Sequence, residues 1–466
     1  MTRNLPYDTE DLQRKDRAHV LHPWASLETR RADDPLIVAE ADNIYINDTD
    51  GERFIDGIGG MWCVNIGYGR DEMAEAVAEQ IRRMPYYSPF GPLGSPPAAE
   101  LAAKLAALAP GDLDTVFFST SGSSANDSAI RFVQLYFNLT GRPEKKHVIT
   151  RDQAYHGSTY LAASLCGKPE DRGNFDFITD WVHHLEAPNP YRRPKGQSVE
   201  AFCDAKLAEL EDKILEIGPD QVAAFIAEPI LASGGVIVPP PGYHARCLEI
   251  CRKHDVIYIS DEVVTGFGRL GHFFASEPVF DIVPDIITSA KGLTSGYLPL
   301  GATIVSKRLM ERISDDNAQG AVFSNGFTYS GHPVSCAAAL KNIEIMERED
   351  ICGHVREAGP YMQEKLRALA ALPIVGDVRG SHLMGCIECV ADKETREPFP
   401  AEAKVGYRID AHCQARGLIL RPLGSLCVFS PPLTIDETQI DRMVAIMRES
   451  IEATLADLRA EGIWNG

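Results

Sequence analysis

Residues 286–301, IITSAKGLTSGYLPLG, hold the pattern that decides the fold. A short apolar run ends before Lys291, and a glycine-rich loop follows it where an amphipathic helix would show a repeating apolar face. A second apolar run, VIYIS at 256–260, ends directly before Asp261. Open α/β sheets bind their ligands at the carboxyl ends of strands, so Lys291 and Asp261 are candidates for one site.

Apolar runs of this kind alternate with longer helical patterns over most of the chain. The alternation predicts an α/β fold, and the near-continuous Val, Ile and Phe of the runs predicts a mainly parallel central sheet buried on both faces. We expect strands at 115–119, 222–227, 256–260, 285–288 and 301–305. We expect helices between them at 125–137, 201–217, 243–254 and 334–349.

The two ends of the chain differ from this centre. Residues 36–58 predict a β-hairpin whose turn is Asp50-Gly51. Further helices are expected at 71–83, 98–108 and 436–460, and further short strands at 417–421 and 426–429. At 466 residues the chain is too long for one small core. We expect an N-terminal segment (1–65), a large domain (66–332) and a C-terminal domain (333–466), with the two end segments packed together as a smaller α/β lobe.

The charge balance excludes some classes of partner. The net charge is −20, from 46 basic and 66 acidic residues. Nucleic acids and anionic membranes bind clustered Lys and Arg, so neither is expected as a partner, and the acidity predicts a solvated surface. No stretch approaches the roughly 18 continuous apolar residues of a membrane span.

The cysteines and the N-terminus indicate a reducing compartment. Eleven cysteines are scattered along the chain, an odd number that does not fit a disulfide framework. Cys386 and Cys389 form a C-x-x-C, but their apolar stretch predicts a strand, in which residues three apart face opposite ways. No metal site is therefore expected. Residues 1–20 are polar and lack the apolar core of a secretory signal, so we expect a cytoplasmic protein.

A turn rich in serine and glycine follows a third apolar run. Ser121, Gly122 and Ser123 come after the strand expected at 115–119 and lead into the next helix. Free N–H groups and hydroxyls at the positive end of a helix suit a phosphate. The same residues would also serve as a simple helix cap, and from these residues alone that alternative stays open.

The three strand ends together point to one cofactor. A lysine alone at the edge of a sheet is usually solvated, and an aspartate alone is usually a cap or a salt-bridge partner. Pyridoxal phosphate needs an amine to bind it covalently, an acid to keep its ring nitrogen protonated and a cradle for its phosphate. Lys291, Asp261 and the turn at 121–123 supply these groups in one predicted sheet.

Several motifs resemble those of the class III aminotransferases. They are SGSSAND (121–127), YHGST (155–159), AFIAEPI (224–230), ISDEVVTGFGRLG (259–271), AKGLTSGYLPLGA (290–302) and GFTYSGHP (326–333). The resemblance extends from GMWCVNIGYG (60–69) to LILRPLG (418–424) and is strongest to the ω-amino acid–pyruvate and putrescine–pyruvate transaminases. It implies the fold type I architecture, pyridoxal phosphate as cofactor, and a homodimer with shared active sites or a tetramer.

The resemblance also implies a role for each matching residue. Lys291 would bind the cofactor and move protons, and Asp261 would pair with the ring nitrogen. Other cofactor contacts would be Ser121, Gly122 and Ser123 at the phosphate, Tyr155 and Val263 on the two ring faces, Glu228 near the ring hydroxyl, and Thr328 from the neighbouring subunit. His156 is expected to support the site from behind or to pack. Ser124 stands where the family commonly has an acid, at the start of a helix, and should change the chemistry little.

Substrate binding is assigned by the same resemblance to Trp62, Phe90, Tyr155 and Arg421. Relatives that use ornithine or γ-aminobutyrate have a glutamate where this chain has Ser233, and that glutamate pairs with the arginine. Without it, Arg421 would be free to hold the carboxylate of a keto acid. Aromatic walls suit an apolar or aryl-alkyl amine, although Trp62 and Phe90 would also serve as ordinary core packing.

We therefore expect a transaminase that moves an amino group from a primary amine or ω-amino acid to pyruvate, giving an aldehyde or ketone and alanine. A 2-oxoglutarate-dependent aminotransferase, or a decarboxylase or aminomutase on the same fold, would keep every cofactor residue and stays open as an alternative. A cofactor-binding regulator would be expected to lack the lysine or to have an added DNA-binding segment, and neither holds here.

Overall fold

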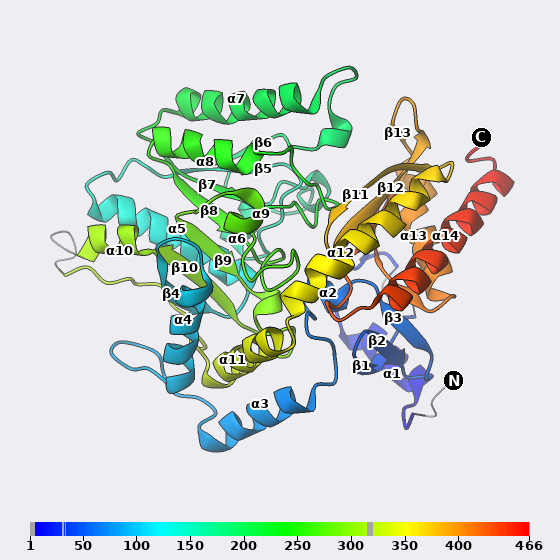
Figure 1. Cartoon of the computed structure of the whole chain (residues 1–466), viewed down its shortest axis with the longest axis horizontal. Coiled ribbons are helices and arrows are strands. Elements are labelled where there is room, and N and C mark those ends of the chain that lie inside the picture. Colours follow the sequence, from blue (N-terminus) through cyan, green and yellow to red (C-terminus); the bar gives the residue numbers. More distant parts are fainter. Residues whose placement is uncertain (1–4, 30–31, 33, 315–319, 466) are drawn as a thin grey trace.

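The computed structural model describes residues 5–29, 32, 34–314 and 320–465, and a seven-stranded sheet lies at its centre (Figure 1). The strand order is β4-β10-β9-β8-β7-β5-β6. β10 runs antiparallel to both neighbours and the other pairings are parallel, which confirms the expected mainly parallel sheet. The strands are β4 (Leu113–Ser119), β5 (His147–Arg151), β6 (Val182–Leu185), β7 (Val222–Ala227), β8 (Ile257–Asp261), β9 (Ile286–Ser289) and β10 (Gly301–Ser306).

The α-helices include every helix that the sequence predicts, with ends that differ by at most three residues. They are α1 (Thr9–His19), α2 (Gly59–Trp62), α3 (Asp71–Arg83), α4 (Pro96–Leu108), α5 (Gly122–Leu139), α6 (Tyr160–Leu165), α7 (Val199–Ile217), α8 (Tyr243–Lys253), α9 (Ser276–Phe280), α10 (Lys307–Ser314), α11 (Pro333–Arg348), α12 (Ile351–Arg367), α13 (Val405–Gln414) and α14 (Glu437–Ala460). No helix of the described residues is long and apolar enough to cross a membrane.

Helices cover both faces of the central sheet. α5 packs on one face, and α7 with α8 packs on the other. Side chains alternate along a strand, so Ala224 and Ile226 of β7 belong to the apolar cluster on the α5 side. Phe225, between them, belongs to the cluster on the α7–α8 side. The expected burial of the strands on both faces is confirmed.

Strands from the two ends of the chain meet in a four-stranded sheet of order β1-β2-β3-β14. β1 (Val38–Asp42), β2 (Tyr45–Asp48) and β3 (Arg53–Asp56) pair antiparallel, and the predicted turn Asp50-Gly51 lies between β2 and β3. β14 (Leu418–Ile419) then joins β3 in parallel. Segments more than 350 residues apart in the sequence therefore share one sheet.

A third sheet has the order β11-β12-β16-β15, with β13 paired to β12. Its strands are β11 (Val375–Ser381), β12 (Met384–Asp392), β13 (Glu397–Pro398), β15 (Arg421–Leu423) and β16 (Leu426–Phe429). Cys386 and Cys389 of β12 belong to different apolar clusters, as expected for residues on opposite faces of a strand. All eleven cysteines are free thiols.

Strands β5, β6 and β11 were not predicted. β5 (HVITR) and β6 (VHHL) have only two apolar residues each, and their neighbours in the sheet supply the rest of their burial. β11 (VGDVRGS) is partly buried along most of its length and reads as a loop. Asp261 was expected directly after a strand, and it is instead the last residue of β8.

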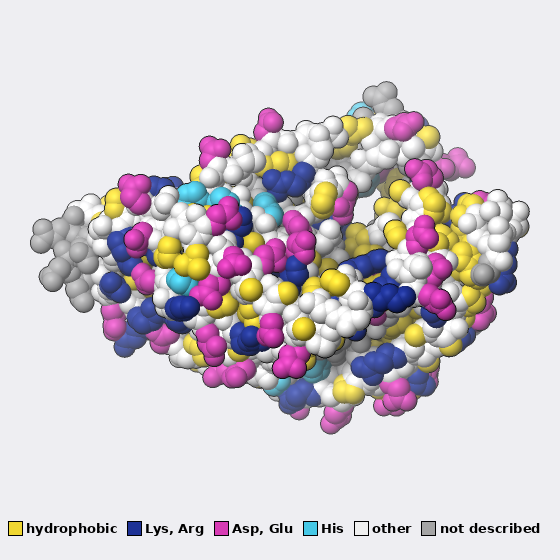
Figure 2. All heavy atoms as spheres, turned by 90° about the horizontal axis from the view of Figure 1, so that it is seen from above, with side chains coloured by type: hydrophobic (Ala, Val, Ile, Leu, Met, Phe, Trp, Pro, Cys, Tyr) yellow, Lys and Arg dark blue, Asp and Glu magenta, His cyan; other side chains and the backbone are white. Residues whose placement is uncertain are grey.

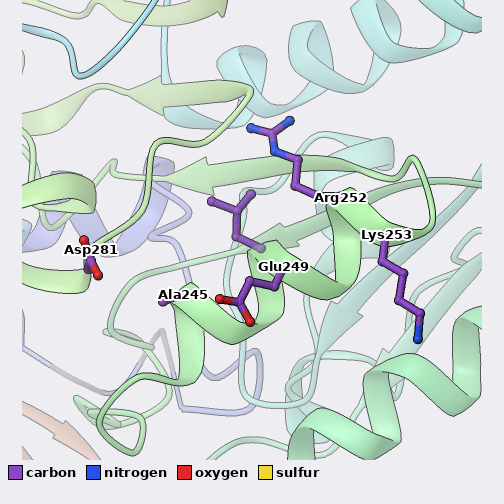
Figure 3. Close-up of a pocket in the computed structure, with 6 residues that line it drawn as sticks. Ala245, Glu249, Arg252, Lys253 and Asp281 are labelled. Carbon is purple, nitrogen blue, oxygen red and sulfur yellow. The ribbon is translucent and has the colours of Figure 1, made fainter.

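Charged side chains of both signs are interspersed on the face of the molecule in Figure 2. The acidic excess is therefore not gathered there into one patch. A hollow along α8 (Figure 3) is lined by Glu249, Arg252, Lys253 and Asp281, among others. Arg252 pairs with Asp285, and none of the expected site residues lines this hollow, so we assign it no role.

Candidate active site

Lys291 follows β9 and begins a short 3-10 turn, Lys291–Leu293. Its φ is 41°, in the left-handed region that non-glycine residues rarely occupy and that is often strained at functional sites. The next residue, Gly292, lies so close to Asn65 that a Cβ there would be 2.3 Å from the amide nitrogen. From α11, Asn342 Nδ2 donates to the carbonyl oxygens of Gly292 and Leu293 at 2.9 and 3.0 Å. The surrounding packing therefore holds the lysine in this conformation.

Burial lowers the pKa of the Lys291 amine, and the nearby carboxylates of Asp261 and Glu228 partly oppose that shift. The amine is therefore closer to its neutral form than a solvated lysine would be. A neutral amine is a nucleophile and can accept a proton, whereas an ammonium can do neither.

Asp261 is almost fully buried, with 3 % of its surface exposed, and each of its oxygens is hydrogen-bonded. His156 Nδ1 donates to Oδ2 at 2.7 Å, and Asn126 Nδ2 donates to the same oxygen at 2.8 Å. The backbone N–H of Val263 donates to Oδ1 at 3.1 Å. The support from His156 was expected, and the contact with Asn126 was not.

The turn at 121–123 leads into α5, and its structure suits both expected roles, as a helix cap and as a phosphate site. Ser121 is the N-cap: Ser124 N donates to Ser121 Oγ at 3.2 Å, and Ser121 N donates to Ser124 Oγ at 2.9 Å. This reciprocal bond gives Ser124 a capping role where the family commonly has an acid. Gly122 and Ser123 occupy the first turn, whose N–H groups have no acceptor within the helix and face an anion favourably.

Two glycines allow neighbouring segments to pack closely against this turn. A Cβ on Gly122 would lie 2.9 Å from Val263 Cγ1. A Cβ on Gly157 would lie 2.4 Å from Ser123 Oγ, and the Ser158 N–H donates to that hydroxyl at 3.1 Å. The YHGST motif therefore packs directly against the turn, which brings Tyr155, Val263 and residues 121–123 together.

Glu228 follows β7 and holds the backbone of two loops. Its Oε1 accepts from the N–H of Tyr155 at 2.9 Å, and its Oε2 accepts from the N–H of Ala232 at 3.0 Å. Burial raises the pKa of Glu228; the nearby His156 opposes this shift, and Asp261 adds to it. Glu262, in contrast, accepts from the N–H groups of Ala275 and Ser276 at 2.7 and 2.9 Å and so caps α9 away from this group.

The residues expected to bind substrate divide into two groups. Trp62 is buried. Burial raises the pKa of the neighbouring Cys63 thiol, and the nearby charge of Lys291 opposes that rise. Arg421 lies near the hydroxyl of Tyr155; its Nε has no hydrogen-bond partner, and among the described residues no carboxylate forms a salt bridge with it. Burial lowers the pKa of Arg421.

Phe90 and Thr328 form the second group, on a separate and exposed surface. Tyr86 Oη donates to the Thr328 carbonyl at 2.8 Å, and the Tyr86 ring meets the Tyr329 ring at 5.6 Å. Phe90 is 55 % exposed and Tyr329 57 %. Within the described residues, no hydrogen bond or ring contact joins Phe90 or Thr328 to Lys291 or Asp261.

No pattern in the sequence indicates a role for Trp24. Its ring meets the Tyr155 ring edge to face, with centroids 5.8 Å apart, and its Nε1 donates to Asp171 Oδ1 at 2.9 Å. It lies in a polar N-terminal stretch without periodicity, so only the folded chain reveals its contact with the candidate site. Asn126 could have been noticed, because it lies in the SGSSAND motif.

These residues fit pyridoxal phosphate. Gly122 and Ser123 offer N–H groups that have no acceptor within the helix, and Val263 packs directly against Gly122. From the described residues, Asp261 Oδ1 accepts one hydrogen bond, and it can take a second from a protonated ring nitrogen. The Lys291 amine, shifted toward neutrality, suits covalent attachment of an aldehyde.

Comparisons with known proteins agree with this geometry. The family model described as Aminotransferase class-III matches residues 28–451. A putrescine–pyruvate aminotransferase of Pseudomonas aeruginosa is 41% identical over 453 residues, which cover 97% of this chain and 98% of the relative. The mitochondrial γ-aminobutyrate transaminase 1 of Oryza sativa subsp. indica is 38% identical and covers 92% of this chain and 84% of its own length. A solved (S)-enantioselective ω-transaminase from Thermomicrobium roseum superposes with a TM-score of 0.92 at 40% identity, over 97% of this chain and 99% of that one.

Proposed function

This chain belongs to the class-III aminotransferases, pyridoxal-phosphate enzymes of fold type I, and on that premise we propose that it transfers an amino group from a primary amine or ω-amino acid to pyruvate. The products are an aldehyde or ketone and alanine. The observation that carries the choice of pyruvate is the guanidinium of Arg421 beside Tyr155: its Nη1 contacts the sulfur of Met61, and its buried Nε has no hydrogen-bond partner among the described residues.

Arg421 is suited to a small keto acid. A guanidinium binds a carboxylate through two parallel hydrogen bonds, and such a pair is strong where water is limited. Ser233, close after Glu228, offers no carboxylate that could compete for the arginine. A donor without a carboxylate makes no demand on Arg421, so one pocket serves the amine in one half of the reaction and pyruvate in the other.

The residues around Lys291 divide the chemical work. When bound, pyridoxal phosphate supplies an electron-withdrawing ring that accepts the negative charge developing on the donor carbon. Lys291 Nζ would take the proton from that carbon in the first half of the reaction and give a proton to the acceptor carbon in the second, which its lowered pKa permits. Asp261 Oδ1 would accept a hydrogen bond from the ring nitrogen and keep it protonated. The N–H groups of Gly122 and Ser123 would hold the phosphate, with Tyr155 and Val263 beside the ring.

We propose that the working unit is a homodimer with shared active sites, with a tetramer as the alternative. The exposed aromatic surface of Tyr86, Phe90 and Tyr329 supports this proposal, since large apolar patches on a surface often mark interfaces. On a dimer, Phe90 would line the partner's substrate pocket, and Thr328 would reach the partner's phosphate. Eleven free thiols support a reducing cytoplasm as the place of action.

The test is an alanine-formation assay with pyruvate against a panel of donors. The panel contains β-alanine, putrescine, a taurine-like amine and an aryl-alkyl amine. We expect alanine from at least one donor, in an amount equal to the carbonyl product. Turnover with 2-oxoglutarate and none with pyruvate would contradict the proposed acceptor. Release of carbon dioxide or internal migration of the amino group, without alanine, would indicate the decarboxylase or aminomutase alternative.

A further inference from the structure

Asn126 lies behind Asp261, in the second turn of α5, and is fully buried. Its amide has one acceptor and two N–H groups, and all three are used. Nδ2 donates to Asp261 Oδ2 at 2.8 Å and to the backbone carbonyl of His156 at 2.7 Å. Oδ1 accepts from Thr288 Oγ1 at 2.7 Å. The amide thus joins α5, β8, β9 and the YHGST loop.

The orientation of this amide follows from the chemistry of its neighbours. The amide oxygen has no proton, so Thr288 must donate to it. Were the amide turned over, its oxygen would face the Asp261 carboxylate and the His156 carbonyl, both of which are acceptors. Because Asn126 is fully buried, such a mismatch would leave several polar atoms unpaired at a large cost. The Asp261 carboxylate and the His156 carbonyl therefore set the orientation of the amide with Nδ2 toward Asp261, and the Thr288 hydroxyl, by donating to Oδ1, holds the amide in that position.

The amide makes the two oxygens of Asp261 unequal. Oδ2 accepts from both His156 Nδ1 and Asn126 Nδ2, which fills the two lone-pair directions of a carboxylate oxygen. Oδ1 accepts only the longer bond from the Val263 N–H, at 3.1 Å, and keeps one direction free. Two donors on one oxygen also stop the carboxylate from rotating about its χ2 bond.

We propose that Asn126, locked by Thr288, is a positioning residue that fixes Asp261 with Oδ1 as the single oxygen left to bind the protonated ring nitrogen of the cofactor. The proposal rests on the proposed role of Asp261. Asn126 and Thr288 would then strengthen cofactor binding only by way of the hydrogen bond between Asp261 and the ring nitrogen.

The test compares two cofactors on the apoenzyme. Pyridoxal phosphate is titrated beside its 1-deaza analogue, in which carbon replaces the ring nitrogen, and the two dissociation constants are measured by absorbance or fluorescence. The wild-type protein should bind the natural cofactor more tightly. Asn126→Leu, which keeps the volume but removes the amide, should weaken pyridoxal phosphate by about tenfold or more, the size of one hydrogen bond to a charged group. Its affinity for the deaza analogue should stay within about twofold.

A matched pair of threonines guards against a folding artefact. Thr288→Val removes only the hydroxyl that locks the amide and should shift the ratio of the two constants in the same direction, by a smaller factor. Thr303 lies opposite Thr288 in the neighbouring strand, is equally buried, and donates to the Ala125 carbonyl of the same helix at 2.8 Å. Thr303→Val should leave the ratio unchanged.

Equal weakening of both cofactors by Asn126→Leu and Thr288→Val would overturn the proposal, because a merely structural role acts on both alike. An unchanged ratio in both variants would overturn it too, as would a wild-type protein with no preference between the cofactors, since Asp261 would then not bind the ring nitrogen. Failure of the pyruvate assignment shows separately, as absence of alanine in the donor assay.

Discussion

The indole ring of Trp24 meets the phenol ring of Tyr155 edge to face, with centroids 5.8 Å apart and planes at 65°. The Trp24 backbone has a φ of 58°, and its indole N–H is held by Asp171. A residue close to the N-terminus is thereby fixed against the tyrosine expected to stack on the cofactor. The N-terminal segment is part of the wall around the candidate site.

Trp24→Ala should remove the ring contact that supports Tyr155. An aromatic pair contributes about 0.5–1.5 kcal/mol beyond its buried area, so we expect the KM for the amine donor to rise about 2- to 10-fold, with a smaller change in kcat. Asp171→Asn, which weakens the acceptor of the indole N–H, should act in the same direction. Steady-state kinetics with the best donor measure both. Leu27→Ala, at a residue 78 % exposed in the same segment, is the control and should change neither constant.

Lys291→Ala should abolish the yellow absorbance of the covalently bound cofactor and lower turnover by at least about a thousandfold, because both attachment and proton transfer are lost. An absorbance spectrum and the alanine assay measure the two effects. Lys307→Ala serves as a control, since that side chain is 59 % exposed and pairs with Glu311 on the surface. A yellow band that survives in the alanine variant would contradict the assignment of Lys291.

The apoenzyme should become more stable when Lys291 is replaced by Met. Burial lowers the pKa of the lysine in the folded state, so between that value and its ordinary pKa of 10.5 the unfolded chain binds more protons. The wild-type apoenzyme therefore gains stability as pH rises through this window. At neutral pH we expect the Met variant to exceed it by about 1–2 kcal/mol in the free energy of unfolding, and the difference should shrink toward pH 10. Urea unfolding across pH measures it, and a difference independent of pH would contradict the explanation.

Arg421→Ala should separate the two half-reactions. Loss of a bidentate contact with a carboxylate is expected to raise the KM for pyruvate about 10- to 100-fold. The first half-reaction with a donor that lacks a carboxylate should keep its rate within about twofold, as single-turnover absorbance would show. Arg416→Ala, at an arginine paired with Glu449 on the surface, is the matched control. Equal losses in both half-reactions would argue against a role in acceptor binding.

Subunit mixing tests whether the sites are shared. Lys291→Ala and Thr328→Glu should each be almost inactive, the second because its carboxylate would repel the phosphate of the neighbouring subunit. In a mixed dimer, one site combines an intact lysine with an intact threonine, so refolding an equal mixture should restore about a quarter of the wild-type activity. Lys291→Ala mixed with Asp261→Ala has both lesions on the same side of the interface and should restore none. Mixed dimers without activity in the first pair would contradict shared sites.

The sequence predicted the central sheet and its helices well because their signals are local. Runs such as VAAFIA are apolar enough to require burial on both faces, and that burial is found. β6 was not predicted because its sequence, VHHL, has little strand character of its own, and it forms a strand by pairing with β5. The resemblance to class III aminotransferases proved correct, as the family match over residues 28–451 shows.

Site residues could be predicted where a motif lies at the end of a strand. Contacts between segments that are distant in the sequence could not. Asp261, Glu228 and Lys291 each stand at or just beyond the end of a recognisable strand, and the fold places them within electrostatic reach of one another. The partners of Asp261 are separated from it by 135 and 105 residues, so no local pattern could pair Asn126 or His156 with it. The roles of these residues remain predictions for the experiments above.

The parallel pairing of β14 with β3 has a consequence for how such an enzyme is made and how it diversifies. The groups proposed to hold the cofactor lie at strand ends and loops of the central sheet, whereas Arg421 begins β15, two residues after β14, and Trp62 lies shortly after β3. A ribosome completes the central sheet long before it releases Arg421, so with the proposed roles a nascent chain has its cofactor-binding residues before its acceptor-binding arginine. Exchange of the segment after β14 would then change the proposed contact with the keto acid while leaving the central sheet intact.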